Sequence, residues 1–308
     1  MKYKNWLFEW LENYVKISNK SRTYERYKDM TNLHIVPQLG EYDIEELSPI
    51  ILQKFVTSLF TNGNKRNNKG LSASYIKCIM AVVQSSLKTA YSLGMTKLYT
   101  ANNIKLPKIM EKQVISFNYS EQKKIENYIF SSKQLKLKGV ILCLYTGIRI
   151  GELLALKWED IDFANKRLFV HESCHDGYVN GKHCVIMDTP KTDNSIRQIP
   201  LSKPLISMLK DLKKNSKCQY VISYKNKPIL VRSYQKTFDI LLKKLDIPHK
   251  GFHSLRHTFA TRAIECGMDI KSLSEILGHK NATITLNRYA HSLWEHKTDM
   301  MNRLGRML

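Results

Sequence analysis

The sequence predicts a mainly α-helical protein with a small antiparallel β-sheet, arranged in two domains. Apolar residues recur at the helical period over most of the 308 residues. Alternating β-branched runs, typical of strands, occur only within residues 167–201. Residues 107–118 contain Pro107 and mixed charges with no clear period. We therefore expect a helical domain at residues 1–106, a linker at 107–118, and a second domain with helices and the sheet at 119–308.

Four helices are predicted in the first domain. Ser48 and Ser72 each precede an apolar periodic stretch and are suited to cap a helix, with Pro49 at a first helical position. Gly94 is suited to end the last helix. The predicted helices cover, in order, residues 6–15, 21–37, 49–60 and 72–93. No strand pattern interrupts them, which indicates a small helical module that could lie against a phosphate backbone.

The second domain is predicted to be a helical body with the sheet on one side. Strands are expected at residues 167–171 and 185–187, joined by the turn-rich stretch 176–182, and at 197–201. The predicted helices cover residues 120–131, 134–157, 203–215, 232–245, 253–266, 269–277 and 281–303.

The charge balance indicates a polyanionic partner. Lysine and arginine number 49, against 27 aspartate and glutamate residues, which gives a formal net charge of +22. The parts before and after Leu106 are both basic, so the excess is not confined to a tail. A polyanion is therefore the expected partner of a chain with this balance.

Membrane and export functions are not expected. The most apolar stretch, residues 139–148, is about half of the roughly 20 residues that a spanning helix needs. Charges interrupt the N-terminal residues where a signal peptide would be apolar. The six cysteines form no CxxC pair, so reduced thiols and a cytoplasmic location are expected.

Arg149 is the first candidate for a chemical role. It lies at the end of an apolar stretch and beside two glycines, in TGIRIGELLALKWEDID. An ordinary surface arginine is the simpler alternative. Glu152, three residues further on, would share its helical face and could hold the guanidinium group in one orientation.

Lys191 is the second candidate, in TPKTDNSIRQIPL, where Pro190 and Asp193-Asn194 predict a tight turn between two strands. Such a lysine is usually solvated, but a hairpin can also present its ammonium group to a phosphate.

In HSLRHT, His253 and Arg256 are three residues apart and could converge on one anion. His257 lies off that face and is assigned to packing or to the surface.

His279 and Tyr289 complete the candidate set. His279 follows Leu277-Gly278, where the glycine is suited to end a helix. Tyr289 follows ten residues later, in TLNRYAH. A tyrosine in an amphipathic helix usually belongs to the core or its rim. Because its unperturbed pKa is near 10, its hydroxyl becomes a nucleophile only beside cations or a base.

The combined set points to phosphoryl transfer without a metal ion. Guanidinium groups can supply the positive charge that the non-bridging oxygens of the pentavalent state require. Tyrosine, lysine and histidine can supply the nucleophile and the acid for the leaving oxygen. No carboxylate cluster suited to a metal accompanies these residues, so neither a metal nor another cofactor is expected.

Four strings in the second domain resemble the boxes of the tyrosine recombinase (phage integrase) family, in the family's order. They are TGIRIGELLALKW, TPKTDNSIRQIPL, HSLRHTFAT and LGHKNATITLNRYAH. In the first domain, HIVPQLG, SPIILQKF and the helix ending in YSLG are similar to the family's core-binding module. The resemblance covers nearly the whole chain. It implies a helical core-binding domain followed by an α+β catalytic domain.

The resemblance also implies a role for each candidate. Arg149, Arg256 and His279 would bind the scissile phosphate, and Lys191 would protonate the departing 5′ oxygen. His253 would assist proton transfer. Attack by Tyr289 would then leave a 3′-phosphotyrosine and a free 5′ hydroxyl, so that rejoining needs no ATP.

The assembly implied by the resemblance is a homotetramer on double-stranded DNA that exchanges strands through a four-way (Holliday) junction, formed from a protein that is monomeric when free. An excision or DNA-bending factor is a possible further partner. Leu293, Met300, Leu304 and Met307 recur on one helical face near the C-terminus. This stripe could dock onto a neighbouring protomer or pack on its own domain.

Within the family, integration and excision of a mobile element is favoured over chromosome-dimer resolution of the Xer type. Xer-type proteins resemble this chain in length and in starting with the core-binding module. Their connection between the arginine box and the lysine is short, however, whereas 41 residues lie between Arg149 and Lys191. The TPKTDNSIRQIPL string is more similar to integrases of phages and conjugative transposons. Many of these carry an additional N-terminal arm-binding domain, for which this chain has no room.

Three alternatives lie outside this interpretation. A type IB topoisomerase would use the same tyrosine and basic cluster to relax supercoils, and a DNA-binding protein could have lost catalysis. Against them stand the recombinase box spacing and the presence of all six residue types. The third alternative is a zinc site in residues 171–184, which contain three histidines and two cysteines. Their spacing matches no familiar zinc finger or ribbon.

Overall fold

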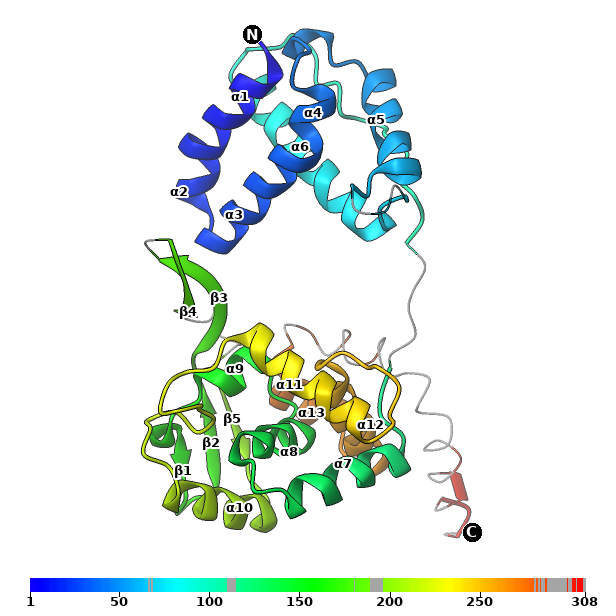
Figure 1. The fold of residues 1–308 in the computed structure, drawn as a ribbon. Coiled ribbons are helices and arrows are strands. Elements are labelled where there is room, and N and C mark those ends of the chain that lie inside the picture. The colour runs from blue at the N-terminus through cyan, green and yellow to red at the C-terminus, as the bar shows by residue number, and fades with distance from the viewer. Residues whose placement is uncertain are drawn as a thin grey trace. The chain divides into compact units, whose positions relative to one another are not determined.

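The computed structural model describes residues 1–65, 67, 69–109, 115–179, 181–188, 196–279, 281, 283, 286, 298, 301–302 and 304–306. The chain forms two compact units, Met1–Lys112 and Gln113–Leu308 (Figure 1). The predicted mainly helical fold with small antiparallel sheets is confirmed. Among the described residues, no helix combines the length and the apolar character that crossing a membrane requires.

In its described part, the N-terminal unit consists of helices and the loops between them, with one isolated β-bridge between Lys2 and Asp43. Its elements are α1 (Tyr3–Trp10), a π-helical turn (Leu11–Val15), α2 (Lys16–Ser18), α3 (Ser21–Met30), a second π-helical turn (Thr31–Ile35), α4 (Val36–Leu39), a 3₁₀ turn (Ile44–Glu46), α5 (Pro49–Asn62) and α6 (Ala73–Ser92).

Local signals set the helix ends in this unit. The Ser48 hydroxyl accepts a hydrogen bond from the N–H of Ile51 at 3.4 Å, and the Ser72 hydroxyl accepts one from Tyr75 at 3.3 Å. Gly94, at φ +72°, follows the end of α6. The second predicted helix ends at Leu39, close to the expected end near Pro37. Pro37 stands in the first turn of α4, where its missing N–H is tolerated.

Aromatic side chains of α1 join that helix to α6. The Tyr3 hydroxyl hydrogen-bonds the Ser86 hydroxyl at 2.6 Å, and the Trp6 indole N–H donates to the Ser86 carbonyl at 3.1 Å. The Trp10 indole N–H donates to Thr89 Oγ1 at 3.1 Å. These bonds satisfy the polar atoms of large rings that are otherwise buried in apolar surroundings.

The C-terminal unit contains the sheets and the remaining helices. The helical elements are α7 (Tyr119–Ser131), a 3₁₀ turn (Leu135–Leu137), α8 (Lys138–Thr146), α9 (Ile150–Ala155), a second 3₁₀ turn (Trp158–Asp160), α10 (Lys203–Lys214), α11 (Val231–Lys244), α12 (Ser254–Glu265) and α13 (Ile270–Leu277). The helix expected at residues 281–303 falls largely outside the described residues, as do Leu293, Met300 and Met307 of the predicted C-terminal stripe.

The prediction of a single helix at residues 134–157 is wrong. The structure has two helices there, α8 and α9, separated at Gly147, which adopts φ +66°. Both helices are largely buried, so apolar residues continue across the break and hide it. The glycine was the signal of the interruption, because a left-handed residue commonly follows a helix end.

Two antiparallel sheets replace the single sheet expected. β1 (Ile161–Asp162), β2 (Arg167–Val170) and β5 (Arg197–Pro200) form one sheet in the order β1-β2-β5. β3 (Ser173–Val179) and β4 (Lys182–Asp188) form the other. Residues 176–179, assigned to a turn by the sequence, therefore belong to a strand.

Strand β3 is polar, and its partner contacts explain why it forms. Its residues pair in continuous register with β4, from Ser173 opposite Asp188 to Val179 opposite Lys182. The Asp176 carboxylate also accepts hydrogen bonds from the first two backbone N–H groups of α11, at 2.7 and 2.9 Å.

β4 pairs with β3, whereas β5 pairs with β2, so the expectation of a hairpin around Lys191 is wrong.

Candidate active site

Arg149 lies between α8 and α9, in an extended conformation at φ −77° and ψ 154°. The preceding Gly147 leaves no room for a side chain, since a Cβ atom there would lie 2.5 Å from Phe259 and 2.8 Å from Leu277. Its left-handed backbone, at φ +66°, lets the chain turn sharply here and start α9 at Ile150. The Arg149 side chain is 39% exposed, so one side of the guanidinium group faces solvent.

Glu152 is the carboxylate that holds this arginine. Its Oε1 accepts from Arg149 Nη1 at 2.8 Å, and its Oε2 accepts from the Arg149 backbone N–H at 2.9 Å. Arg197 binds the same carboxylate from the other side, with Nη2 to Oε2 at 2.7 Å and Nη1 to Oε1 at 3.1 Å. The side chains of Glu152 and Arg197 are only 7% and 6% exposed.

Arg256 lies in the first turn of α12 and is 3% exposed. Its Nη1 donates to the carbonyl of Gly147 at 2.7 Å, and its Nη2 donates to the carbonyl of Leu277 at 2.6 Å. This second arginine therefore ties the turn before Arg149 to the end of α13. A rigid cationic group results, because two backbone acceptors define the plane of the guanidinium.

The C-terminal end of α13 organises the site, because three successive carbonyls there each accept from a different arginine. The pairs are Arg197 Nε to Ile276 at 2.6 Å, Arg256 Nη2 to Leu277 at 2.6 Å, and Arg149 Nη2 to Gly278 at 3.4 Å. The last carbonyls of a helix lack intrahelical partners and carry partial negative charge. The helix end thus gathers three cationic groups that would otherwise repel one another.

The two candidate histidines flank this cluster. His279 directly follows Gly278, which adopts φ +64° and ends α13 as expected, and its backbone N–H donates to the Ser274 carbonyl at 3.1 Å. His253 directly precedes α12 and is exposed. Its ring meets His257 edge to face, with centroids 4.7 Å apart. The structure thus brings Arg149, Arg256 and His279 together around one helix end, with His253 three residues before Arg256.

Lys191 and Tyr289 lie outside the described residues. In the chain, Lys191 falls between β4 and β5, six residues before Arg197, and Tyr289 falls ten residues after His279. Their proposed roles therefore depend on the sequence.

Sequence reasoning missed Arg197. A signal was present, because Arg197 shares its face of β5 with the buried Ile199 and Leu201. A charged residue on an apolar face needs a buried partner of opposite charge. That partner, Glu152, is 45 residues away in the chain, so local spacing could not identify it.

Burial alone would raise the pKa of the Glu152 carboxyl. The hydrogen bonds and charge of Arg197, together with the charge and backbone N–H of Arg149, overcome this effect and lower the pKa from 4.5 to about 2. The carboxylate therefore stays ionised over the physiological range and serves as a fixed anchor.

We expect this anchor to make stability depend on acid. Since the folded pKa of Glu152 is below the unfolded one, its stabilisation is complete above about pH 5 and is lost as the pH falls towards about 2. A shift of this size corresponds to about 3 kcal/mol. We therefore expect the free energy of unfolding, measured by calorimetry on the full chain, to fall less steeply with decreasing pH for Glu152→Gln than for the unchanged protein. Parallel curves for the two proteins would contradict the assignment.

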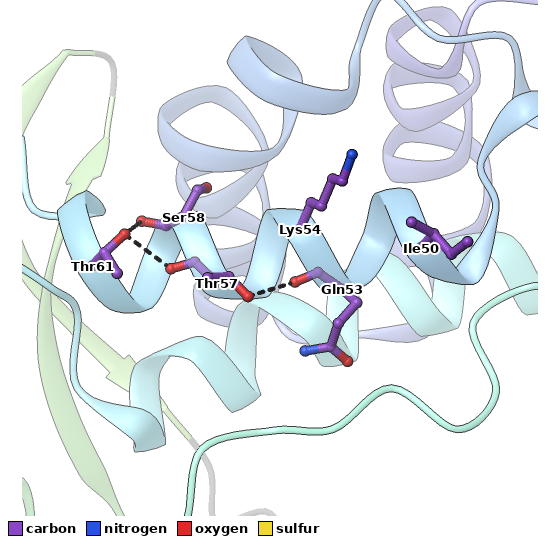
Figure 2. A pocket seen from close by; sticks show the side chains of 6 residues that line it. All are labelled: Ile50, Gln53, Lys54, Thr57, Ser58 and Thr61. Carbon is purple, nitrogen blue, oxygen red and sulfur yellow. Dashed lines mark hydrogen bonds between the residues drawn. The ribbon is translucent and has the colours of Figure 1, made fainter.

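Two other regions of the chain differ from this cluster. The hollow along α5 has a volume of about 430 Å³, but Lys54 is the only titratable side chain among its lining residues, Ile50, Gln53, Lys54, Thr57, Ser58 and Thr61 (Figure 2). Within the described part of the chain, no three His, Cys, Asp or Glu side chains are grouped as a metal would require. His171 and His175 instead pair with Asp160 and Asp188, at 3.3 and 3.1 Å.

Comparison with known proteins places this site in a family context. Residues 108–296 match the phage integrase family, and residues 2–60 match the phage integrase N-terminal SAM-like domain. A tyrosine recombinase XerC-like protein of Caldanaerobacter subterraneus subsp. tengcongensis is 30% identical, over 96% of this chain and 81% of the relative. The ICEBs1 integrase of Bacillus subtilis is 26% identical, over 95% of this chain and 80% of the relative.

Solved structures show the same fold. The Tn1549 transposon integrase, solved in complex with a circular intermediate DNA, aligns with a TM-score of 0.82 at 22% identity over 99% of both chains. A lambda integrase dimer bound to a COC′ core site aligns with a TM-score of 0.70 at 19% identity, over 92% of this chain and 97% of that chain. The architecture expected from the sequence, a helical domain followed by an α+β domain, is confirmed.

Proposed function

Because the chain belongs to the phage integrase family and is a site-specific tyrosine recombinase, we propose that it integrates and excises a mobile genetic element by cutting and rejoining double-stranded DNA. The observation that carries this proposal is the cluster of Arg149 and Arg256 on the last carbonyls of α13, directly before His279. Such a cluster is suited to bind a phosphodiester whose negative charge grows as the reaction proceeds.

Each residue has a step in the proposed reaction. Arg149, Arg256 and His279 bind the non-bridging oxygens of the scissile phosphate. The Tyr289 oxygen forms a bond to phosphorus as its proton leaves with the help of His253, and the bond from phosphorus to the 5′ oxygen breaks. Lys191 gives that oxygen a proton. The products are a 3′-phosphotyrosine and a free 5′ hydroxyl, and attack by the 5′ hydroxyl of a second strand reverses the sequence.

Neither a metal ion nor ATP takes part in this proposal. Fixed guanidinium groups supply the positive charge on the phosphate oxygens. The covalent phosphotyrosine keeps a phosphodiester in place of the one that was broken, so that joining requires no new energy source.

The proposed partner is double-stranded DNA, bound in the cytoplasm by four copies of the chain that assemble from monomers. Its net charge of +22 supports binding to a polyanion. Neighbours in fold have been solved as a dimer on a core site and as a tetramer on a Holliday junction, both of lambda integrase. The proposal also allows an excision or DNA-bending factor as a further partner.

Chromosome-dimer resolution remains the second candidate, because the XerC-like relative is 30% identical over nearly the whole chain. Integration is favoured by the long connection between Arg149 and Lys191, which contains both strands of the β3-β4 sheet. It is also favoured by the ICEBs1 integrase, which matches 95% of the chain.

A plasmid assay tests the proposal. The DNA flanking the coding region is searched for repeats, and the repeat pair is cloned into one supercoiled plasmid. Purified protein should excise the segment between the repeats and leave a plasmid without them intact. Relaxation of any plasmid, with no dependence on the repeats, would instead indicate a topoisomerase. Recombination confined to a chromosomal dimer-resolution site would indicate the second candidate.

Binding to the recombination site should weaken steeply with salt. Each phosphate neutralised by lysine or arginine releases counterions from the duplex. With about six such contacts, we expect affinity to fall on the order of a thousandfold between about 50 and 200 mM salt. A fluorescence anisotropy titration measures this slope, and a flat response would exclude an interface based on phosphate contacts.

A further inference from the structure

We propose that Arg197 is a positioning residue for strand cleavage, which keeps Arg149 oriented and keeps the net charge of the group formed by Arg149, Glu152 and Arg197 positive towards the phosphate. The inference rests on the proposed phosphate-binding role of Arg149. Arg197 itself does not contact DNA in this proposal. It acts through the carboxylate of Glu152 and through the turn of α13 that precedes His279.

The first step is that the Arg197 guanidinium forms hydrogen bonds within the protein. Its Nη1 and Nη2 form a two-pronged contact with Glu152, and its Nε donates to the carbonyl of Ile276. Each of its three nitrogens therefore has a protein acceptor. With a side chain only 6% exposed, Arg197 serves to hold its neighbours in place.

The second step is the shape of the turn around Gly278. A Cβ atom at Gly278 would lie 3.1 Å from Arg197 Cδ and 3.2 Å from its Nη1. The backbone therefore packs directly on the arginine side chain. Because His279 is the next residue, the position of Arg197 defines where the chain leaves α13 towards that histidine.

The third step concerns charge. Arg149 and Glu152 alone would form a neutral pair, and a neutral pair attracts a phosphate weakly. A second arginine on the same carboxylate leaves a net charge of one positive unit in the group of three. Glu152 can then orient Arg149 through two hydrogen bonds without cancelling the charge offered to the phosphate.

Arg197→Met tests this inference in single-turnover cleavage of a nicked duplex that traps the covalent adduct. We expect unchanged DNA affinity and a rate about a hundredfold lower. On a duplex with a neutral methylphosphonate at the scissile position, the loss should be less than about fivefold, since less charge develops there. The ratio of the cleavage rates on the two substrates does not depend on the fraction of the variant protein that is folded. Equal losses on both substrates, or no loss on either, would overturn the proposal.

A double variant covers the case in which the single variant is unstable. Arg197→Met leaves Glu152 with one partner fewer in a buried place, whereas adding Glu152→Gln removes the uncompensated charge. The double variant restores one net positive charge on Arg149, so we expect it to cleave the phosphodiester about tenfold faster than Arg197→Met does. A double variant that melts like the unchanged protein but cleaves no faster than the single one would overturn the charge argument.

Arg167→Met provides the matched control. Arg167 lies on β2 and is exposed, and its side chain donates to Gln198 at 3.3 Å. It should change both rates by less than about twofold. The unchanged protein separates the two hypotheses: if it forms no adduct on the phosphodiester duplex, the proposed function fails, whereas normal adduct formation with an unaffected Arg197→Met variant rejects only the role of Arg197.

Discussion

Tyr289→Phe should bind the recombination site with unchanged affinity and form no covalent protein–DNA adduct. Only one oxygen atom is removed, so contacts to DNA remain while the attacking group is lost. Loss of a catalytic nucleophile can cost about six orders of magnitude in rate. The measurement is denaturing gel electrophoresis of a labelled nicked duplex after incubation with the protein, in parallel with a binding titration.

The tyrosine is a poor nucleophile without its surroundings, since its unperturbed pKa is near 10. The cationic cluster on α13 could favour the phenolate, which links this prediction to the described part of the site. Tyr224→Phe is a suitable control, because its ring is 57% exposed and lies in a turn. It should form the adduct at the normal rate. An adduct formed by Tyr289→Phe, mapped by peptide sequencing to another residue, would show that the nucleophile was wrongly assigned.

The helix ends could be predicted because their causes are local. Ser48, Ser72 and Gly278 each act within four residues of their own position, through a hydroxyl acceptor or a left-handed backbone. The division of residues 134–157 into two helices could not be seen in the apolar pattern. Gly147 breaks the helix, but the helices on both sides are buried, so their hydrophobic period is uninterrupted.

The candidate site was predictable only where its residues are close in sequence. The expectation that Arg149 and Glu152 share a helical face is wrong, because Arg149 precedes α9 in an extended conformation. Their three-residue spacing still brings them together, since Glu152 contacts the residue before the helix at 2.8 Å. Strand β3 also depends on α11, which lies 55 residues further along the chain, and Arg197 depends on Glu152, 45 residues before it. The acceptors at the end of α13 are backbone carbonyls, which leave no mark on the side-chain sequence.

Arg256→Lys should lower the rate of adduct formation by about a hundredfold to a thousandfold while leaving the affinity for DNA nearly unchanged. The guanidinium binds the carbonyls of Gly147 and Leu277 at once. A lysine ammonium is a point charge and cannot span both carbonyls and also face a phosphate in the same plane. Removal of one preorganised donor from a developing negative charge has an effect of this size.

Arg262→Lys is the control for Arg256→Lys. It tests whether replacing any arginine of α12 by lysine lowers the rate of adduct formation. Arg262 lies on the same helix, its side chain is 29% exposed, and it pairs with Glu265 at 2.6 Å. We expect its adduct rate to stay within about threefold of the unchanged protein. Single-turnover rates at saturating protein, combined with thermal unfolding of each variant, distinguish slow chemistry from loss of folded protein. Near-normal cleavage by a folded Arg256→Lys variant would mean that a point charge suffices, and the geometric argument built on the end of α13 would then fail.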